Sequence, residues 1–421
     1  MKIDNLRAWE ILDSRGRPTV LAEVQLAGNA IGLASAPSGA SSGQAEAHEL
    51  RDGESTRYGG LGCRKAVGHV NDQISQAIVG GAFASQGDLD KALLSLDGSP
   101  NKSNLGANAL LAVSLAFSKA AAVFEQKPLY QFYADQLGIT QMQLPRPTIN
   151  LFSGGLHAGG QVPIQDVLVV PSSAQSIDEA LAMTFNVFYT AARMAQENYG
   201  YRLLRADEGG LAPPFEHADA MLQAAVKAIE AAGYRPGEDV SLAVDVASSH
   251  FYKTGGYALG KHPISSEEMT DVVVGWVNDY PIVSVEDGLA EEDWGNWSLL
   301  KEKIGDKALV LGDDLLCTNP ARIDKAIDMD AADALLLKVN QIGTLSEAGE
   351  AYKKARAAGW GVTVSARSGE TEDSWLADLA VGWAGNQIKV GAITQSERLA
   401  KYNRLLVIEA ETKLPLETWP G

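Results

Sequence analysis

Short apolar runs alternate with helical patterns over about 250 residues, from the Pro145–Pro147 region to about residue 395. Eight runs are strand candidates: TINLFSG, QDVLVVP, VSLAVDVASS, PIVSVEDG, ALVLGDDL, ALLLKVNQIG, WGVTVSARSG and NQIKVGAI. Several of the helical patterns between them begin with Ser, Thr or Asn, the preferred N-cap residues. Continuous apolar strands that alternate with helices are typical of a parallel sheet buried on both faces. Eight such units in this length predict an αβ barrel of the TIM-like kind.

Charged residues recur at the ends of these apolar runs. The five positions are Asp245, Glu286, Asp313, Lys338 and Lys389. With roughly 30 residues per strand–helix unit, successive positions lie one or two units apart. The carboxyl ends of barrel strands meet at one rim, where barrel active sites lie. We therefore expect these five side chains to share one site.

Three carboxylates at one rim would repel each other unless a cation lay between them. Asp245, Glu286 and Asp313 are oxygen ligands suited to Mg²⁺, although any one of them alone would more often be a surface or capping acid. Lys338 follows four apolar residues, and near a bound dication its neutral form becomes accessible, which suits removal of a proton next to a carboxylate. Lys389 offers a second cation for a carboxylate substrate. Either lysine alone would also fit a structural ion pair.

Weaker signals lie in the loops between these units. Arg367 and Ser368, in SARSGETED, stand between a strand and a helical pattern, and an Arg, a hydroxyl and a helix N-terminus would together suit a phosphate. Glu208 lies in a Gly/Pro-rich loop that can reach over a site. His157 is flanked by glycines and is as often incidental as functional in such a loop.

The first 135 residues read differently from the barrel region. EILDSRGRPTVLAEVQLAG predicts two strands joined by a turn, and NLGANALLAVSLAFSKAAAVF predicts a buried helix. We therefore expect an N-terminal α+β capping domain over 1–135 and the barrel over 140–421.

Composition excludes several classes of protein. The net charge of −18 and the lack of a Lys/Arg-rich run argue against nucleic acid as a partner. No apolar stretch reaches the roughly 20 residues of a membrane span, and the N-terminus lacks a signal-peptide pattern. Cys63 and Cys317 are expected to be small buried side chains rather than a disulfide. The expected compartment is the cytoplasm.

Several motifs, in order along almost the whole chain, resemble the enolase (phosphopyruvate hydratase) family. DSRGRPTV and PSGASSG resemble the family's DSRGNPTV and PSGASTG. ADEGGLAP, YPIVSVEDGL, LLLKVNQIGT, SGETEDS and SERLAKYN are equally similar to family runs. The resemblance implies a Mg²⁺-dependent carbon–oxygen lyase that dehydrates 2-phosphoglycerate to phosphoenolpyruvate, as in glycolysis. It also implies a homodimer or a ring of dimers.

The resemblance also implies a role for each candidate residue. Asp245, Glu286 and Asp313 would bind the first Mg²⁺, and Ser41 a second one when its loop closes. Lys338 would be the base at C2, and Glu208 the acid for the leaving hydroxyl. The remaining implied contacts are Lys389 to the substrate carboxylate, Arg367 and Ser368 to the phosphate, and His157 in a second lid loop.

Two residues depart from the family pattern inside the substrate shell. The family's SHRSGETED reads SARSGETED here, so Ala366 replaces a histidine, and Asp166 stands where a catalytic glutamate is usual. A displacement of about 1 Å in a catalytic group can cost on the order of 100-fold in rate. Three readings follow: a glycolytic enolase with tolerated changes, a paralogue acting on another phosphorylated or phosphonylated carboxylic acid (as in phosphonate or phosphinate biosynthesis), or a non-catalytic scaffold. The retained acids and Lys338 argue against the scaffold.

Overall fold

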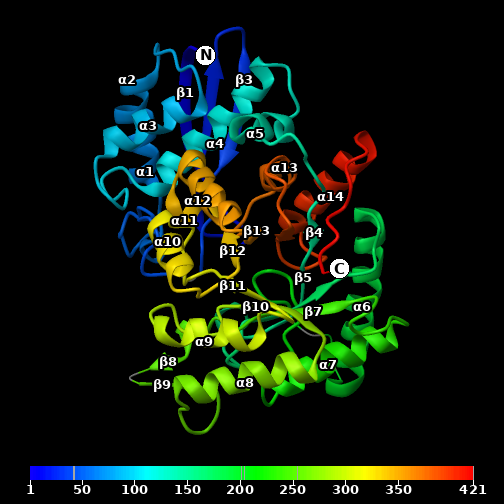
Figure 1. The fold of residues 1–421 in the computed structure, drawn as a ribbon. Helices are drawn as coiled ribbons and strands as arrows, with labels where there is room; N and C mark the ends of the chain where they lie inside the picture. The colour runs from blue at the N-terminus through cyan, green and yellow to red at the C-terminus, as the bar shows by residue number, and fades with distance from the viewer. Residues whose placement is uncertain (41–42, 201, 203, 254, 421) are drawn as a thin grey trace.

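The apolar runs of the second part of the chain form a closed ring of strands (Figure 1). The computed structural model describes residues 1–40, 43–200, 202, 204–253 and 255–420. Thr148 alone separates β4 from β5, and its amide donates to the carbonyl of Ile388 at 3.0 Å, so β4 and β5 act as one strand. That strand pairs with β14 on one side and with β6 on the other, which closes an eight-membered barrel. The barrel strands are β4 (Arg146–Pro147), β5 (Ile149–Ser153), β6 (Asp166–Val170), β7 (Ser241–Asp245), β10 (Ile282–Glu286), β11 (Leu309–Gly312), β12 (Ala334–Leu337), β13 (Gly361–Ser365) and β14 (Gln387–Lys389).

One strand runs against the others, so the prediction of a parallel sheet was wrong at this point. β6 pairs antiparallel with both β5 and β7. The connection from β5 to β6 is a loop with one short 3-10 turn, η3 (Gly155–His157), rather than a crossover helix. A short loop returns the chain antiparallel, whereas a parallel neighbour needs a longer crossover. As a result the first residue of β6, and not its last, lies at the carboxyl rim of the other strands.

Helices cover the outside of the barrel, and polar side chains begin several of them. Ser176, Asn319 and Thr344 each accept a backbone N–H of the following helix, as the N-cap pattern predicted. Ser265 forms a full capping box with Glu268. The helices are α6 (Ile177–Tyr199), α7 (Ala218–Ala231), α8 (Ser266–Asp279), α9 (Trp294–Ile304), α10 (Pro320–Asp328), α11 (Val339–Ile342), α12 (Leu345–Ala357), α13 (Trp375–Gly382) and α14 (Ser396–Glu411). A small hairpin, β8 (Tyr252–Lys253) and β9 (Gly256–Tyr257), precedes α8.

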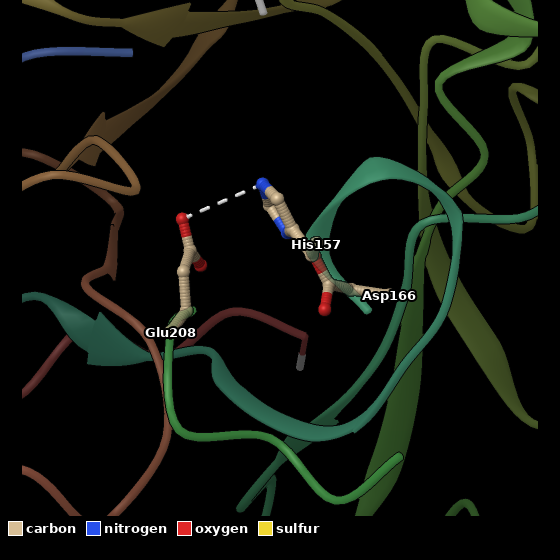
Figure 2. Close-up of side chains that lie close together, drawn as sticks. All are labelled: His157, Asp166 and Glu208. Atoms are coloured by element: carbon tan, nitrogen blue, oxygen red, sulfur yellow. Dashed lines mark hydrogen bonds and ion pairs between the residues drawn. The ribbon is translucent and has the colours of Figure 1, made fainter. Parts of the chain in front are cut away.

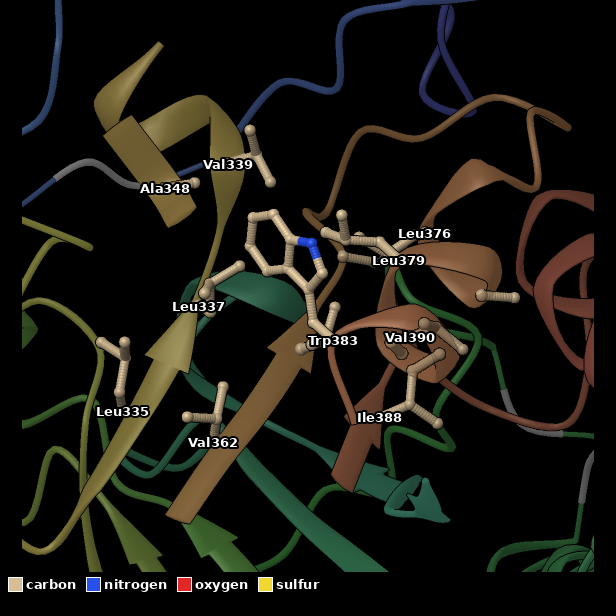
Figure 3. Close-up of a cluster of buried hydrophobic side chains, with 14 of the residues drawn as sticks. Leu335, Leu337, Val339, Ala348, Val362, Leu376, Leu379, Trp383, Ile388 and Val390 are labelled. Carbon is tan, nitrogen blue, oxygen red and sulfur yellow. The ribbon is translucent and has the colours of Figure 1, made fainter. Parts of the chain in front are cut away.

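Aliphatic side chains of neighbouring strands and helices pack around Trp383 (Figure 3). Trp383 is fully buried at the end of α13, with Leu337 and Val362 from two strands and Leu376 and Leu379 from its own helix around it. This packing fixes the end of β14, which carries Lys389, against β12 and β13.

The N-terminal part is a three-stranded antiparallel sheet backed by helices. It contains β1 (Ile3–Leu12), β2 (Pro18–Leu26) and β3 (Ala30–Ser35), followed by α1 (Arg64–His69), η2 (Val70–Ile74), α2 (Ser75–Ile78), α3 (Gln86–Asp97), α4 (Ala107–Phe124) and α5 (Leu129–Leu137). Among the described helices α4 alone is long and apolar enough to cross a membrane, but 83% of that window is buried inside the protein, as expected for a core helix. Both cysteines are buried and unpaired, as predicted.

Ion pairs attach the N-terminal part to the barrel. Lys102 contacts Glu347 at 2.5 Å, and Lys119 contacts Asp373 at 2.5 Å. A backbone bridge also joins Ser38 to Gly369. These contacts place the loop after β3 beside the segment that follows β13, at the carboxyl rim of the barrel.

Candidate active site

The strand register brings charged side chains from neighbouring strands to one level of the rim. Asp166 is the register partner of Asp245, which is in turn the partner of Glu286. Ser365 pairs in the same way with Lys389. Register partners point to the same face of a sheet, so these side chains project together. The rim predicted from the sequence is thus present in the structure, with the antiparallel β6 contributing its first residue.

Lys389 lies between two of the predicted metal ligands. Its Nζ atom is 2.8 Å from Oδ2 of Asp245 and 2.6 Å from Oε2 of Glu286, and all three side chains are less than 10% exposed. Burial would raise the pKa of Asp245, but the Lys389 ammonium group lowers it below its usual value. Burial, together with the charge of Asp245, raises the pKa of Glu286 well above its usual range. Nearby carboxylates raise the pKa of Lys389 despite its burial, so the lysine is charged.

Lys338 forms a second ion pair, with Asp313. Gln341, one turn further along the chain, donates to the other oxygen of Asp313 at 2.8 Å. Burial alone would lower the pKa of Lys338, but the Asp313 carboxylate raises it above its usual value. In the protein without a metal ion, Lys338 is therefore protonated, and its ion pair with Asp313 stabilises the protonated form.

The carboxylates at the rim fit a hard divalent cation. Glu286 Oε1 is buried and has no hydrogen-bond partner among the described residues. A bound cation would satisfy this oxygen atom. In the described part of the chain, two groups bring candidate ligand atoms within 4.8 Å of one another: Asp287, Asp313 and Asp314, and His157, Asp166 and Glu208. The three predicted ligands Asp245, Glu286 and Asp313 are not such a group; Lys389 contacts the first two, and Lys338 contacts Asp313. An ion bound by these three would take the place of lysine contacts.

His157, Asp166 and Glu208 converge from two loops and a strand (Figure 2). Nδ1 of His157 is 2.8 Å from Oδ2 of Asp166, and its Nε2 is 3.9 Å from Oε1 of Glu208. Ser153 donates to the other oxygen of Asp166, and Asn150 donates to Glu208 at 3.0 Å.

The proton of this group resides on the histidine. Burial opposes the charge on His157, but the Asp166 and Glu208 carboxylates raise its pKa to about 9. Burial would raise the pKa of Glu208, but His157 and several other cations lower it to about 2. Glu208 is therefore ionised, and His157 is the charged acid beside it.

Arg367 and Ser368 lie in the loop after β13, but no helix begins there. Helix α13 starts only at Trp375, so the expectation of a helix N-terminus at a phosphate site was wrong. Lys401, buried in α14, bonds Glu370 at 2.9 Å and the carbonyl of Thr371 at 2.7 Å, and so ties the GETED segment to that helix. The positive charge at this place comes from side chains instead.

Two arginines hold the loop that carries Arg367 and Ser368. Arg398 of α14 donates to the carbonyls of Arg367 and Ser368 at 2.7 and 2.6 Å, and Arg15 donates to Ser368 Oγ at 2.9 Å. Arg367 itself pairs with Glu46, with Nη1 3.0 Å from Oε2. Sequence patterns did not identify Arg15 or Arg398, because both act through contacts more than 25 residues away in the chain.

Most of the predicted catalytic and substrate residues line one small cavity, and Asp166 lies outside its wall, in contact with His157. Its walls contain His157, Gln165, Glu208, Asp245, Lys338, Ser365, Ala366, Arg367, Ser368 and Lys389. Ala366 is thus placed in the wall of the cavity and not behind it. Gln165, missed by the sequence analysis, donates to Asp245 at 3.1 Å. The predicted Ser41 lies outside the described residues.

Two family models match the chain in succession. The enolase N-terminal domain matches residues 3–133, and the enolase C-terminal TIM barrel domain matches residues 141–414. The chain belongs to the enolase family. An enolase-type metal-dependent lyase, acting through acidic residues that are able to hold a metal, is consistent with this membership.

Proposed function

We propose that this chain is a Mg²⁺-dependent enolase that dehydrates 2-phosphoglycerate to phosphoenolpyruvate, as a cytoplasmic homodimer. The observation that carries the proposal is the placement of the base and the acid. Lys338 follows β12 and Asp166 begins β6, and these strands are four positions apart in either direction around the eight-membered barrel. The cavity therefore has an amine on one side and the His157–Glu208 pair on the other.

The side chains divide the work of an elimination. Lys338 takes the proton from C2, and the His157–Glu208 pair supplies a proton to the hydroxyl that leaves from C3. Arg367 and Ser368 bind the phosphate, and Lys389 the carboxylate. Each cation is now held by a carboxylate of the protein, so substrate binding replaces internal ion pairs. Mg²⁺, when bound at Asp245, Glu286 and Asp313, supplies positive charge that opposes the pull of Asp313 on the Lys338 proton and stabilises negative charge on the substrate oxygens.

The direct test is conversion of 2-phosphoglycerate by the purified chain with Mg²⁺, followed by the ultraviolet absorbance of phosphoenolpyruvate. Turnover that disappears on chelation and in Lys338→Gln supports the proposal. The matched control is Lys353→Gln, because Lys353 is an exposed surface lysine. Absence of turnover in a sample that binds Mg²⁺ would contradict it.

A second candidate is a paralogue that acts on another phosphorylated or phosphonylated carboxylic acid. Ala366 and Asp166 favour it, because Ala366 lines the cavity and Asp166 holds His157 in its wall, while the metal ligands and Lys338 keep the family pattern. Alanine removes a ring, and Asp is about 1.5 Å shorter than Glu. This candidate predicts weak turnover of 2-phosphoglycerate that rises in the double variant Ala366→His/Asp166→Glu. An ordinary enolase predicts little change, and a scaffold predicts no substrate-dependent shift of the thermal unfolding temperature.

A further inference from the structure

A second, larger cavity adjoins the catalytic one. Its volume is about 620 Å³, and the N-terminal part forms most of its wall. The residues with polar side chains in that wall include Arg17, His48, Arg51, Asn108, Asn340 and Arg367. No residue of this wall except Arg367 has a role in the proposed dehydration. The cavity is therefore an unassigned space next to a site for a small acid.

Two residues belong to the walls of both cavities. Ala40 and Arg367 line the larger cavity and the catalytic cavity alike. Arg367 is the proposed ligand of the substrate phosphate, so the larger cavity begins where that phosphate would lie. A group attached to the phosphate, or a molecule bound beside it, would extend into this space.

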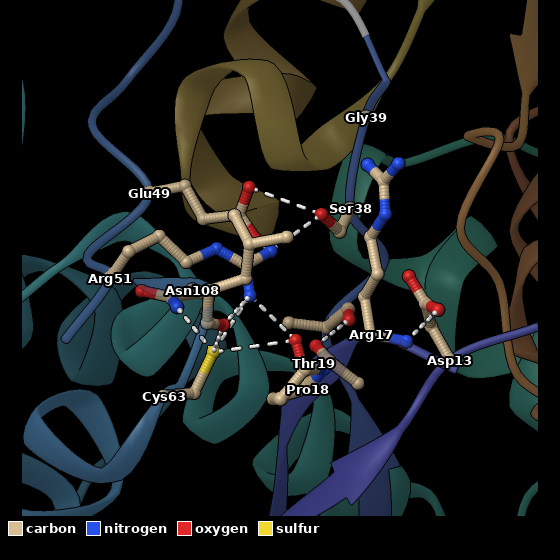
Figure 4. Close-up of polar contacts among 12 residues, drawn as sticks. Asp13, Arg17, Pro18, Thr19, Ser38, Gly39, Glu49, Arg51, Cys63 and Asn108 are labelled. Carbon is tan, nitrogen blue, oxygen red and sulfur yellow. Dashed lines mark hydrogen bonds and ion pairs between the residues drawn. The ribbon is translucent and has the colours of Figure 1, made fainter. Parts of the chain in front are cut away.

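The wall carries more positive charge than its own carboxylates neutralise. Arg51 pairs with Glu49 at 2.5 Å, and Arg367 pairs with Glu46 at 3.0 Å. Arg51 also donates to Ser38, Pro18, Leu61 and Cys63, so both terminal nitrogens of its guanidinium are already engaged (Figure 4).

Arg17 is the cation that remains. Its side chain extends toward the segment at Gly39, and its guanidinium makes no hydrogen bond or ion pair with the residues that the structure describes (Figure 4). Its backbone is fixed, since its amide donates to Asp13 at 2.9 Å. Arg17 is also a position where this chain departs from the asparagine of the DSRGNPTV motif.

We propose that this cavity binds a second anionic group, a phosphate, phosphonate or carboxylate, in contact with Arg17 and next to the substrate phosphate on Arg367. The group is either part of a larger substrate or belongs to a separate second substrate. A planar guanidinium suits each of these anions, since it donates two parallel hydrogen bonds. This second anion site depends on the proposed dehydration in one respect, the placement of the substrate phosphate at Arg367.

Equilibrium dialysis of the full-length protein with Mg²⁺ tests the two sources. Inorganic phosphate is titrated with and without saturating 2-phosphoglycerate, and inorganic pyrophosphate is titrated separately. A separate second substrate predicts that phosphate binds together with 2-phosphoglycerate. A single larger substrate predicts that pyrophosphate binds and displaces 2-phosphoglycerate. In either case Arg17→Asn should weaken the anion by about tenfold, and Arg17→Lys by less.

The control is Arg235→Asn, because Arg235 is an exposed arginine that pairs with its sequence neighbours Glu238 and Asp239 and lies outside the walls of both cavities. The proposal is overturned if phosphate binds only in competition with 2-phosphoglycerate and pyrophosphate binding is unchanged in Arg17→Asn. Failure of 2-phosphoglycerate turnover alone would contradict the proposed function and leave the Arg17-dependent binding of the anion intact, so the two results are separable.

Discussion

The ammonium group of Lys389 lies 2.6 Å from Oε2 of Glu286, and both side chains are almost entirely shielded from water. The same ammonium group contacts Asp245, so one lysine now balances two buried acids. Glu286 Oε1 is left without a partner among the described residues. A buried carboxylate with one oxygen unsatisfied is costly to the fold, and a bound cation would relieve that cost.

The first prediction concerns this carboxylate. Glu286→Gln should weaken Mg²⁺ binding by about 100-fold or more, because it removes a charged ligand while keeping the shape of the side chain. Without Mg²⁺ the same variant should be at least as stable as the parent, since burial raises the pKa of Glu286 and a neutral side chain of the same shape replaces an acid that is costly to ionise. Titration calorimetry gives the affinity, and thermal unfolding with and without Mg²⁺ gives the stability. Glu302→Gln, at an exposed position, is the control; equal Mg²⁺ affinity in both variants would exclude Glu286 as a ligand.

The second prediction separates the base from the acid. Lys338→Gln should abolish exchange of the C2 proton of 2-phosphoglycerate with solvent deuterium, and should lower turnover by about 10²- to 10⁴-fold. Glu208→Gln should lower turnover as well but leave the exchange, because the proton is removed on the opposite side of the barrel. Proton NMR in heavy water follows the exchange. Exchange that survives in Lys338→Gln would assign the base to another residue.

The third prediction concerns the charge of His157. The Asp166 and Glu208 carboxylates raise its pKa to about 9, so its NMR titration should have a midpoint well above that of an ordinary histidine. Asp166→Asn should lower the pKa of His157, because it removes one of the two carboxylates that counteract the effect of burial. Asp207→Asn, in the neighbouring loop, is the control.

The same shift has a consequence for stability. The pKa of His157 is higher in the folded protein than the value of about 6.5 expected in the unfolded chain. Its contribution to stability is therefore complete below about pH 6.5 and is lost as the pH rises through about 9. Unfolding by urea at a series of pH values should show this loss for the parent and not for His157→Gln. An identical pH dependence in both proteins would contradict the assignment.

The sequence predicted the barrel and its charged rim because both depend on local patterns. A buried strand is apolar throughout, so a charge at its end, as at Asp245 or Lys338, is visible without a structure. The ring of these charges follows from the number of strands alone. The direction of β6 was not predictable in this way, since an apolar run reads the same whichever way it pairs.

The supports of the site were not predicted, because they depend on tertiary contacts. Arg398 and Lys401 read as charges on a helix surface, yet both are fully buried in α14 and fix the loop after β13. Arg15 reaches Ser368 from the opposite end of the chain. The hydrophobic pattern of a single sequence does not indicate which residues far apart in the chain will contact each other.

The last prediction concerns the packing that holds β14 in place. Trp383 is fully buried, its ring lies 5.5 Å from that of Tyr352, and its indole nitrogen has no hydrogen-bond partner among the described residues. Trp383→Ala should therefore cost about 3–5 kcal/mol of unfolding free energy through the cavity it leaves. Trp383→Phe should cost clearly less, because it keeps a ring and removes an N–H group that is unsatisfied. Urea unfolding followed by circular dichroism gives both values, with Trp9→Ala as the control at a position that is 42% exposed. Lys389 is the last residue of β14, the strand that this packing supports. Trp383→Ala should therefore also weaken Mg²⁺ binding in the folded protein. An unchanged Mg²⁺ affinity would show that β14 keeps its position without the indole ring.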